Sequence, residues 1–219
     1  MKILFLGDSI TAGAGLVSPS FGYPALVGKK LHCEIKNYGV GGTRIARQKS
    51  PSKEQSFDED FLRRAEKMDK TADLVFVFGG TNDFGHGDAP IGKIDDDTPY
   101  TFCGALNSLI EYLRIVYGKE KVVFILPLHR KDEKNKHGEN DCKPIAAGTL
   151  DDYIAAETAV LKKQKIEFLD LRTDFSLSEI NKLTIDGIHP TADGHLIIAE
   201  AIEAYINKKK KEKCISRVV

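Results

Sequence analysis

Four short patches of this 219-residue chain contain side chains that could do chemistry. A serine hydroxyl becomes a useful nucleophile when a histidine takes its proton and a carboxylate holds that histidine in the correct tautomer. Ser9 supplies the hydroxyl, and Asp186 precedes His189 by three residues, so both side chains can share one side of a turn. This combination predicts acyl transfer at a serine. The patches are residues 7–9 (GDS), 37–42 (NYGVGG), 79–83 (GGTND) and 186–190 (DGIHP).

Acyl transfer also needs hydrogen-bond donors around the oxyanion that forms on the carbonyl oxygen. The candidates are the backbone amides of Ser9 and Gly42 and the side-chain amide of Asn82. Gly42 suits this role because a glycine lets a substrate approach the backbone closely. Other polar side chains are expected to brace the site or line its loops, namely Asp8, Thr81, Asp83, His86 and His129.

Ser9, Gly42 and Asn82 each also have a purely structural explanation. Ser9 could cap a helix that follows the first strand. Gly42 could serve a turn that needs a positive φ, which is compatible with an oxyanion role. Asn82 could bond the backbone of its own loop in an Asx-turn.

Five short apolar runs predict the strands that position these patches, and longer amphipathic stretches between them predict helices. The second run alternates polar and apolar residues, which is typical of an edge strand, whereas most of the others are continuously apolar. The predicted strands are residues 2–6, 34–38, 74–78, 122–126 and 166–169, and the predicted helices are residues 23–31, 58–70, 102–117, 150–163 and 192–208.

The alternation of strand and helix predicts right-handed crossovers and a parallel sheet covered on both faces. The simplest arrangement is a three-layer, doubly wound α/β sandwich with five strands in a single domain, residues 1–219. Ligands of such folds gather at the carboxyl ends of the strands. Three of the four patches follow predicted strands there, and the fourth precedes the last helix, so the topology is expected to bring them together.

Two long segments and the C-terminal end stand outside this pattern. Residues 84–100 are rich in glycine, proline and aspartate, and residues 129–149 are charged and without period, so both are predicted to be loops that overhang the site. Residues 208–219 form a basic tail. Lysines suit the last turn of a helix, so we expect a solvated tail rather than a membrane anchor.

Composition excludes several classes of partner. Lysine plus arginine equal aspartate plus glutamate at 32 each, so no net charge recruits a nucleic acid or a membrane, and a small molecule is the expected partner. The four cysteines lack the close spacing of a zinc site and are expected to be reduced thiols. The apolar start, MKILFL, is too short for a signal peptide, and no run reaches the roughly 18 residues of a membrane span. A cytoplasmic protein is therefore expected.

Taken in series, GDSI, NYGVGG, GGTND and DGIHP resemble the blocks of the GDSL, or SGNH, family of serine hydrolases. The resemblance runs from Leu4 to about Ala199, and its one small departure is Ile10 in place of the leucine of the first block. It implies a flavodoxin-like fold and an esterase, lipase or acylhydrolase activity without a cofactor or a metal. It also implies that Ser9 is the nucleophile rather than a cap, with Gly42 and Asn82 in the oxyanion hole.

The resemblance also decides between two candidate bases. Asp83 and His86 repeat the spacing of Asp186 and His189, but the family blocks favour His189 supported by Asp186. The other histidines are expected to be surface or helix-face residues, although His129 begins a loop near the predicted mouth; they are His32, His129, His137 and His195.

The polar character of both overhanging loops favours short acyl groups, of the acetyl type, on small alcohols or sugars.

Two other functions remain as alternatives. A phosphate- or flavin-binding module of the same architecture could use the turn after the first strand, which however lacks the lysine of a phosphate loop. A metal-dependent phosphoesterase could use Asp8, Asp83, Asp186 and His189 as ligands.

Overall fold

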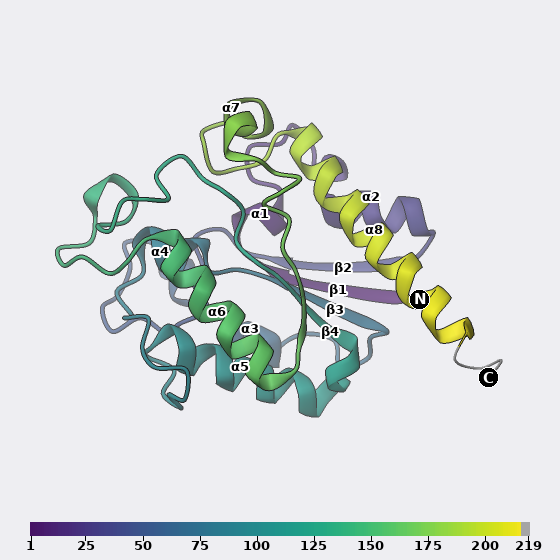
Figure 1. Cartoon of the computed structure of the whole chain (residues 1–219), viewed down its shortest axis with the longest axis horizontal. Coiled ribbons are helices and arrows are strands. Elements are labelled where there is room, and N and C mark those ends of the chain that lie inside the picture. The colour runs from purple at the N-terminus through teal and green to yellow at the C-terminus, as the bar shows by residue number, and fades with distance from the viewer. Residues whose placement is uncertain (216–219) are drawn as a thin grey trace.

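The computed structural model describes residues 1–215 and contains a sheet of five strands (Figure 1). Their spatial order is β2-β1-β3-β4-β5, and every neighbouring pair is parallel. This confirms the predicted α/β fold, and each predicted strand is present with its ends within one residue of the expected position. The strands are β1 (Lys2–Gly7), β2 (Glu34–Gly39), β3 (Leu74–Phe78), β4 (Val122–Ile125) and β5 (Glu167–Leu169).

Burial explains why these short runs form strands. The residues of β4 are all buried, as are those of β1 and β3 after the first residue, which matches their continuous apolar sequence. β2 lies at an edge of the sheet and exposes Glu34 and Asn37, in agreement with its alternating pattern.

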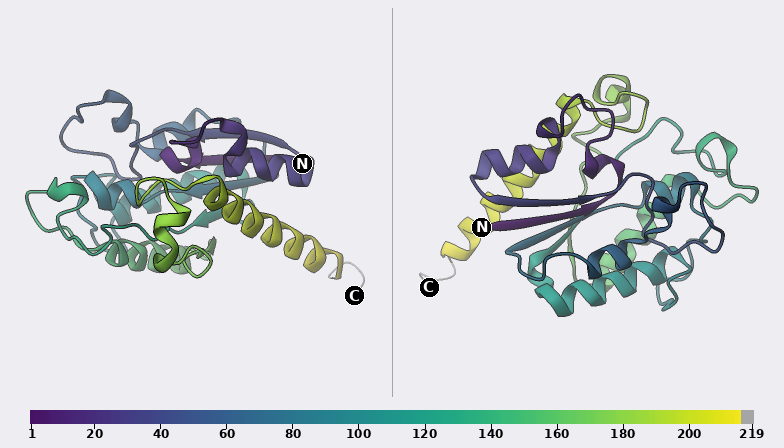
Figure 2. Two further views of the ribbon diagram at one scale, coloured as in Figure 1. Left: turned by 90° about the horizontal axis from the view of Figure 1, so that it is seen from above. Right: turned by 180° about the vertical axis from the view of Figure 1, so that it is seen from behind.

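Helices cover both faces of the sheet and complete the three layers (Figures 1 and 2). Because successive strand residues point to opposite faces, Leu4 and Leu6 pack with α3, α5 and α6, while Ile3 and Phe5 pack with α2 and α8. The helices are α1 (Ser9–Ala12), α2 (Tyr23–Leu31), α3 (Phe61–Glu66), α4 (Thr81–His86), α5 (Phe102–Tyr117), α6 (Leu150–Gln164), α7 (Ile180–Leu183) and α8 (Ala192–Ile215), with 3₁₀ turns at Pro19–Phe21, Gln55–Asp58, Lys119–Lys121, Glu139–Asp141 and Leu177–Glu179.

Local capping sets where several of these helices begin. The Thr101 side chain accepts a hydrogen bond from the third residue of α5, and Thr149 and Asp152 form a reciprocal capping box at α6. The helix predicted over 58–70 is wrong at both ends. Asp60 caps α3 by accepting from the Arg63 amide, so the helix begins at Phe61, and residues 55–58 form a separate 3₁₀ turn.

Three further differences concern helix limits. Residues 84–86 belong to α4 rather than to the predicted loop 84–100, and α1 and α7 are short helices that the hydrophobic pattern did not predict. α8 continues to Ile215, so the predicted basic tail is helical over residues 208–215, and its last turns extend past the sheet (Figure 2). Residues 216–219 lie outside the described part of the chain. Among the described residues, no helix has both the length and the apolar character needed to cross a membrane.

Candidate active site

The nucleophile candidate lies where β1 turns into α1. Asp8 is the cap of α1, because its carboxylate accepts a hydrogen bond of 2.9 Å from the Ile10 amide. Ser9 is the first residue of the helix, so the capping role considered for it belongs to its neighbour. At this position the Ser9 amide has no carbonyl partner within its own helix, which leaves it able to donate to another acceptor.

Three side chains form a continuous hydrogen-bonded series across 180 residues of sequence. Ser9 Oγ lies 2.9 Å from Nε2 of His189, and Nδ1 of the same ring lies 2.7 Å from Oδ2 of Asp186. The carboxylate can only accept, so it favours the tautomer in which Nδ1 carries the proton and Nε2 accepts from the serine hydroxyl. The imidazole is thereby oriented to take a proton from Ser9.

A tight turn fixes the carboxylate and the imidazole relative to each other. Asp186 Oδ1 accepts from the Ile188 amide at 3.0 Å and from the His189 amide at 2.8 Å, so one oxygen organises the turn while the other holds the ring. Partial burial alone would raise the pKa of Asp186, but the hydrogen bonds from His189 and Ile188 outweigh it and lower the pKa. Asp186 is therefore held in the charged form that supports the histidine.

Two of the three candidate oxyanion donors, Gly42 and Asn82, are linked through Thr43, the residue after Gly42. Gly42 has a φ of +72°, and a β-carbon at this position would lie 2.3 Å from the Phe57 ring, so only glycine fits. Asn82 is 7% exposed and donates one Nδ2 hydrogen to the carbonyl of Thr43 at 3.0 Å. The side-chain amide nitrogen of Asn82 carries two hydrogens. One bonds the Thr43 carbonyl, and the other is left to donate to a second acceptor.

Asp83 reinforces the same junction. Its two carboxylate oxygens accept from the amides of Ile45 at 2.9 Å and Ala46 at 2.8 Å, which joins α4 to the loop that follows Gly42. Burial raises the pKa of Asp83 to about 6 against the lowering effect of these hydrogen bonds and of nearby Arg44. Asp83 thus connects α4 to this loop.

The alternative aspartate–histidine pair does not form such a series. While Asp83 bonds the backbone, Nδ1 of His86 lies 3.0 Å from the guanidinium of Arg44. Burial, together with the positive charge of Arg44, lowers the pKa of His86 to about 4. The His86 imidazole therefore bonds Arg44 instead of an aspartate, and its lowered pKa keeps it neutral near pH 7.

The remaining predicted supporting residues are Thr81, which begins α4, and His129 and Asp8, which lie outside the helices and strands. His129 Nδ1 lies 2.7 Å from Glu133, and Thr81 accepts from the Arg130 guanidinium through both its carbonyl and its hydroxyl. Asp8 is buried beside Ser9, and burial raises its pKa to about 6. Among the described residues, no group of three His, Cys, Asp or Glu side chains is arranged to hold a metal ion.

One histidine is placed differently from the expectation. His32 and His137 are exposed, but His195 in α8 is fully buried, stacks on the ring of Tyr23 and accepts from the Tyr23 amide at 3.2 Å. Burial lowers the pKa of His195 to about 4, so it acts as a neutral core residue. The cysteines Cys33, Cys103 and Cys142 are free thiols, and the side chain of Cys214 lies outside the described residues.

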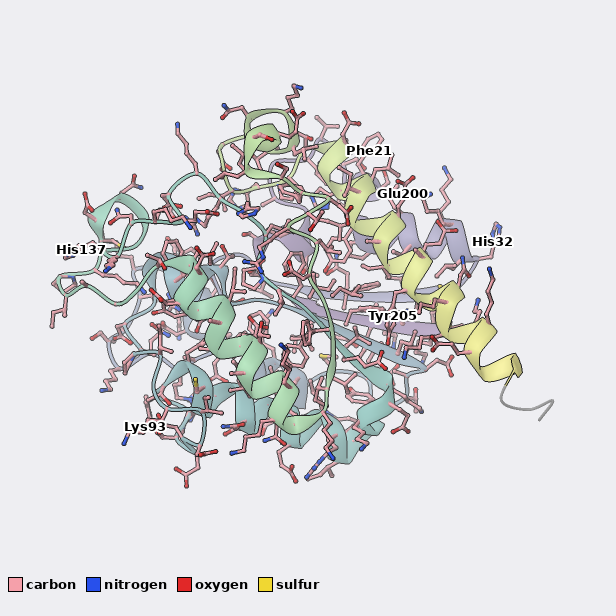
Figure 3. The ribbon with its side chains drawn as sticks, viewed as in Figure 1. Phe21, His32, Lys93, His137, Glu200 and Tyr205 are labelled. Atoms are coloured by element: carbon pink, nitrogen blue, oxygen red, sulfur yellow. The ribbon has the colours of Figure 1, made fainter. Side chains whose placement is uncertain are left out.

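The two predicted overhanging segments meet each other over α4. Lys143 donates to the Asp83 carbonyl at 2.7 Å, and the Cys142 thiol donates to the Gly85 carbonyl at 3.2 Å. Between them lies a pocket of about 410 Å³, with walls that include Ile91 and Ile145. His137 marks the outer end of the 129–149 segment, on the opposite side of the molecule from α8 (Figure 3).

Sequence reasoning missed a set of buried charged residues around the site. Arg64 donates to the carbonyls of Gly7 and Tyr38, where β1 and β2 end, and so fixes the strand ends that carry Ser9 and the glycine loop. Glu157 of α6 is fully buried beneath the turn at Gly80. Arg64 and Glu157 lie at ordinary helix positions, where the sequence pattern gives no signal of their burial.

The model of the GDSL-like lipase/acylhydrolase family matches residues 5–197. The chain belongs to this family. Its members are ester-bond hydrolases, so the GDSL-like chain is an enzyme rather than a phosphate- or flavin-binding module. The family assignment confirms the resemblance found in the four sequence blocks, and the matched range includes all the candidate site residues.

Solved structures share the fold of this GDSL-like hydrolase over nearly its whole length. A protein from Lactobacillus plantarum is 25% identical with a TM-score of 0.79, covering 94% of this chain and 96% of its own. A lipase/acylhydrolase from Enterococcus faecalis is 21% identical with a TM-score of 0.62, covering 95% and 96%. An acetyl xylan esterase is 23% identical with a TM-score of 0.64, covering 94% and 100%. A search among curated proteins finds no match.

Proposed function

We propose that this GDSL-like hydrolase cleaves carboxylic esters through an acyl-enzyme formed on Ser9. Ser9 Oγ attacks the carbonyl carbon while His189 Nε2 takes its proton, and Asp186 stabilises the imidazolium that forms. The amides of Ser9 and Gly42 and the side chain of Asn82 donate to the oxyanion. His189 then protonates the leaving alcohol, and a water molecule deprotonated by the same imidazole releases the acid.

The observation that carries this proposal is the unbroken series from hydroxyl to imidazole to carboxylate. Its two contacts, 2.9 Å from Ser9 to His189 and 2.7 Å from His189 to Asp186, are both within the range needed for proton transfer. The proposed cycle uses only these side chains, the oxyanion donors and water.

For the substrate, we propose short acyl groups of the acetyl type on small alcohols or sugars. The two predicted overhanging segments, residues 84–100 and 129–149, are polar and carry no long apolar helix that would cover an extended acyl chain. The similarity in fold to an acetyl xylan esterase is consistent with this proposal. Chromogenic esters of increasing acyl length test it directly, and a clear preference for long chains would contradict it.

The mechanism is tested by Ser9→Ala, with the exposed Ser178→Ala as the matched control. Ser9→Ala should lower kcat on a short-chain ester by roughly three orders of magnitude or more and should abolish labelling by a fluorophosphonate. Ser178→Ala should keep both properties. Near-normal hydrolysis by Ser9→Ala would end the proposal.

A chelator distinguishes the serine mechanism from a metal-dependent phosphoesterase. Prolonged treatment with EDTA should leave ester hydrolysis unchanged, because the proposed cycle contains no metal ligand. Loss of activity that returns on adding a divalent cation would instead favour the metal-dependent alternative.

A further inference from the structure

An exposed isoleucine, Ile185, lies opposite His189 across the turn that carries the imidazole. Thr184 pairs with Pro190 across the turn, and the Ile185 amide donates to the His189 carbonyl at 2.8 Å, which makes Ile185 and His189 cross-strand neighbours. Such neighbours project their side chains to the same face. Ile185 is 53% exposed, although the other large apolar side chains of this chain are mostly buried. The pairing therefore places an exposed apolar side chain on the same face of the turn as the imidazole.

Part of this side chain is already used to join two loops. A β-carbon at Gly15, where φ is +82°, would lie 2.6 Å from Cδ1 of Ile185, so the isoleucine rests on the glycine backbone of the loop that follows Ser9. This contact brings the loop of the nucleophile against the loop of the base. It covers one end of Ile185 and leaves about half of the side chain available to another molecule.

The facing loop is also apolar. Residues 9–28 contain no charged side chain, in a chain that is 29% charged. Leu16 folds back toward Gly13 and Gly22, Val17 is 95% exposed, and Phe21 lies beside the first turns of α8 (Figure 3). The loop that contacts Ile185 thus carries exposed apolar side chains and no charged side chain.

The chemistry of ester cleavage identifies what this surface faces. His189 Nε2 must deliver a proton to the oxygen of the leaving alcohol, so the alcohol portion of the ester must lie beside this ring. The acyl portion is bonded to the same carbonyl carbon but extends in another direction, and it stays on the enzyme when the alcohol leaves. Ile185 is therefore a contact for the alcohol portion.

We propose that Ile185 and the facing loop form a subsite for an apolar alcohol portion, so that the enzyme favours esters of alkyl or aryl alcohols over esters of sugars. This inference rests on the proposed serine mechanism and narrows its substrate class. Hydroxyl groups of a sugar would lose water against Ile185 without gaining a hydrogen-bond partner there.

The test varies the alcohol and keeps the acyl group constant. Methyl, hexyl and phenyl acetate and an acetylated sugar all give the same acetyl-enzyme, so differences in kcat/KM report only acylation. The wild type is compared with Ile185→Ser and with Ile115→Ser, which removes an isoleucine that is 73% exposed on α5, away from the site. For each ester the ratio of variant to wild type cancels the intrinsic reactivity of the leaving group.

Ile185→Ser should lower kcat/KM for hexyl and phenyl acetate by roughly fivefold to tenfold and change methyl acetate and the sugar ester by less than about twofold. Ile115→Ser should change none of them. Ile185→Leu should restore most of the loss, because it replaces the apolar surface. An unchanged rate would overturn the subsite, as would an equal loss on all four esters, which would mean that Ile185 only positions His189.

The same experiment separates this inference from the mechanism on which it rests. If Ser9→Ala hydrolyses these acetates as fast as the wild type, the serine mechanism fails. If hydrolysis depends on Ser9 but the ratios do not depend on the alcohol, the mechanism stands and the subsite fails. Equal rates of fluorophosphonate labelling in wild type and Ile185→Ser show that the catalytic residues are intact in the variant.

Discussion

The buried glutamate beneath the turn at Gly80 leads to a quantitative prediction. Glu157 is fully buried in α6, and neither of its carboxyl oxygens has a hydrogen-bond partner among the described residues. If Gly80, the residue before α4, carried a β-carbon, that carbon would lie 3.2 Å from Oε2 of Glu157. Burial, reinforced by the negative charge of Asp83, raises the pKa of Glu157 well above its ordinary value of 4.5.

A raised pKa makes the folded state hold a proton that the unfolded state releases. The contribution of Glu157 to stability is fully present below about pH 4.5 and is lost as the pH rises toward the raised pKa. Between these two values, each pH unit removes about 1.4 kcal/mol of unfolding free energy. Glutamine has nearly the same shape and no proton to release. Glu157→Gln should therefore become more stable relative to wild type by about 1.4 kcal/mol for each pH unit in this range.

Urea denaturation at about pH 5, 6, 7 and 8 measures this difference as a slope. Asp8 and Asp83 also titrate in this range, but they are present in both proteins and cancel in the comparison. Glu59→Gln is the matched control, because a hydrogen bond from Lys67 lowers the pKa of that partly exposed carboxylate and gives no such gain. If the unfolding free energies of wild type and Glu157→Gln change with pH in the same way, Glu157 is ionised in the folded protein.

Two further predictions concern the oxyanion donors. Asn82→Ala should lower kcat by on the order of a hundredfold, measured on a short-chain ester with the unfolding curve as a check, and an unchanged kcat would place the donor elsewhere. Asp83→Asn cannot accept from both Ile45 and Ala46, so it should lower kcat by about tenfold with little change in KM. A change in KM alone would mean that Asp83 does not position the oxyanion hole.

The strands and the long helices could be predicted from sequence because a single local signal determines each of them. The apolar run of β3 and the amphipathic period of α5 both gave their observed limits, residues 74–78 and 102–117. The parallel topology then followed from their alternation. That topology alone was enough to predict that the patches lie at the carboxyl ends of the strands.

Helix limits that depend on side-chain partners were less predictable. The predicted helix begins later than expected because the Asp60 carboxylate caps the N-terminus of α3, and α4 is too short to show a period. Whether a histidine is buried also depends on packing between elements. His195 follows the same polar pattern as a surface residue, and only the close packing of α8 against α2 places it on the Tyr23 ring.

The site is held as two separately braced halves, which explains why no local signal showed its full set of supporting residues. In the half that would hold the oxyanion, Asn82 donates to the Thr43 carbonyl, and Asp83 accepts from the amides of Ile45 and Ala46. The half that would transfer protons is fixed by the Asp186 turn, and a bond from the Lys131 amide to the Gly187 carbonyl adds support. Because Ser9 lies between these halves, small displacements of either should affect catalysis more than substrate binding.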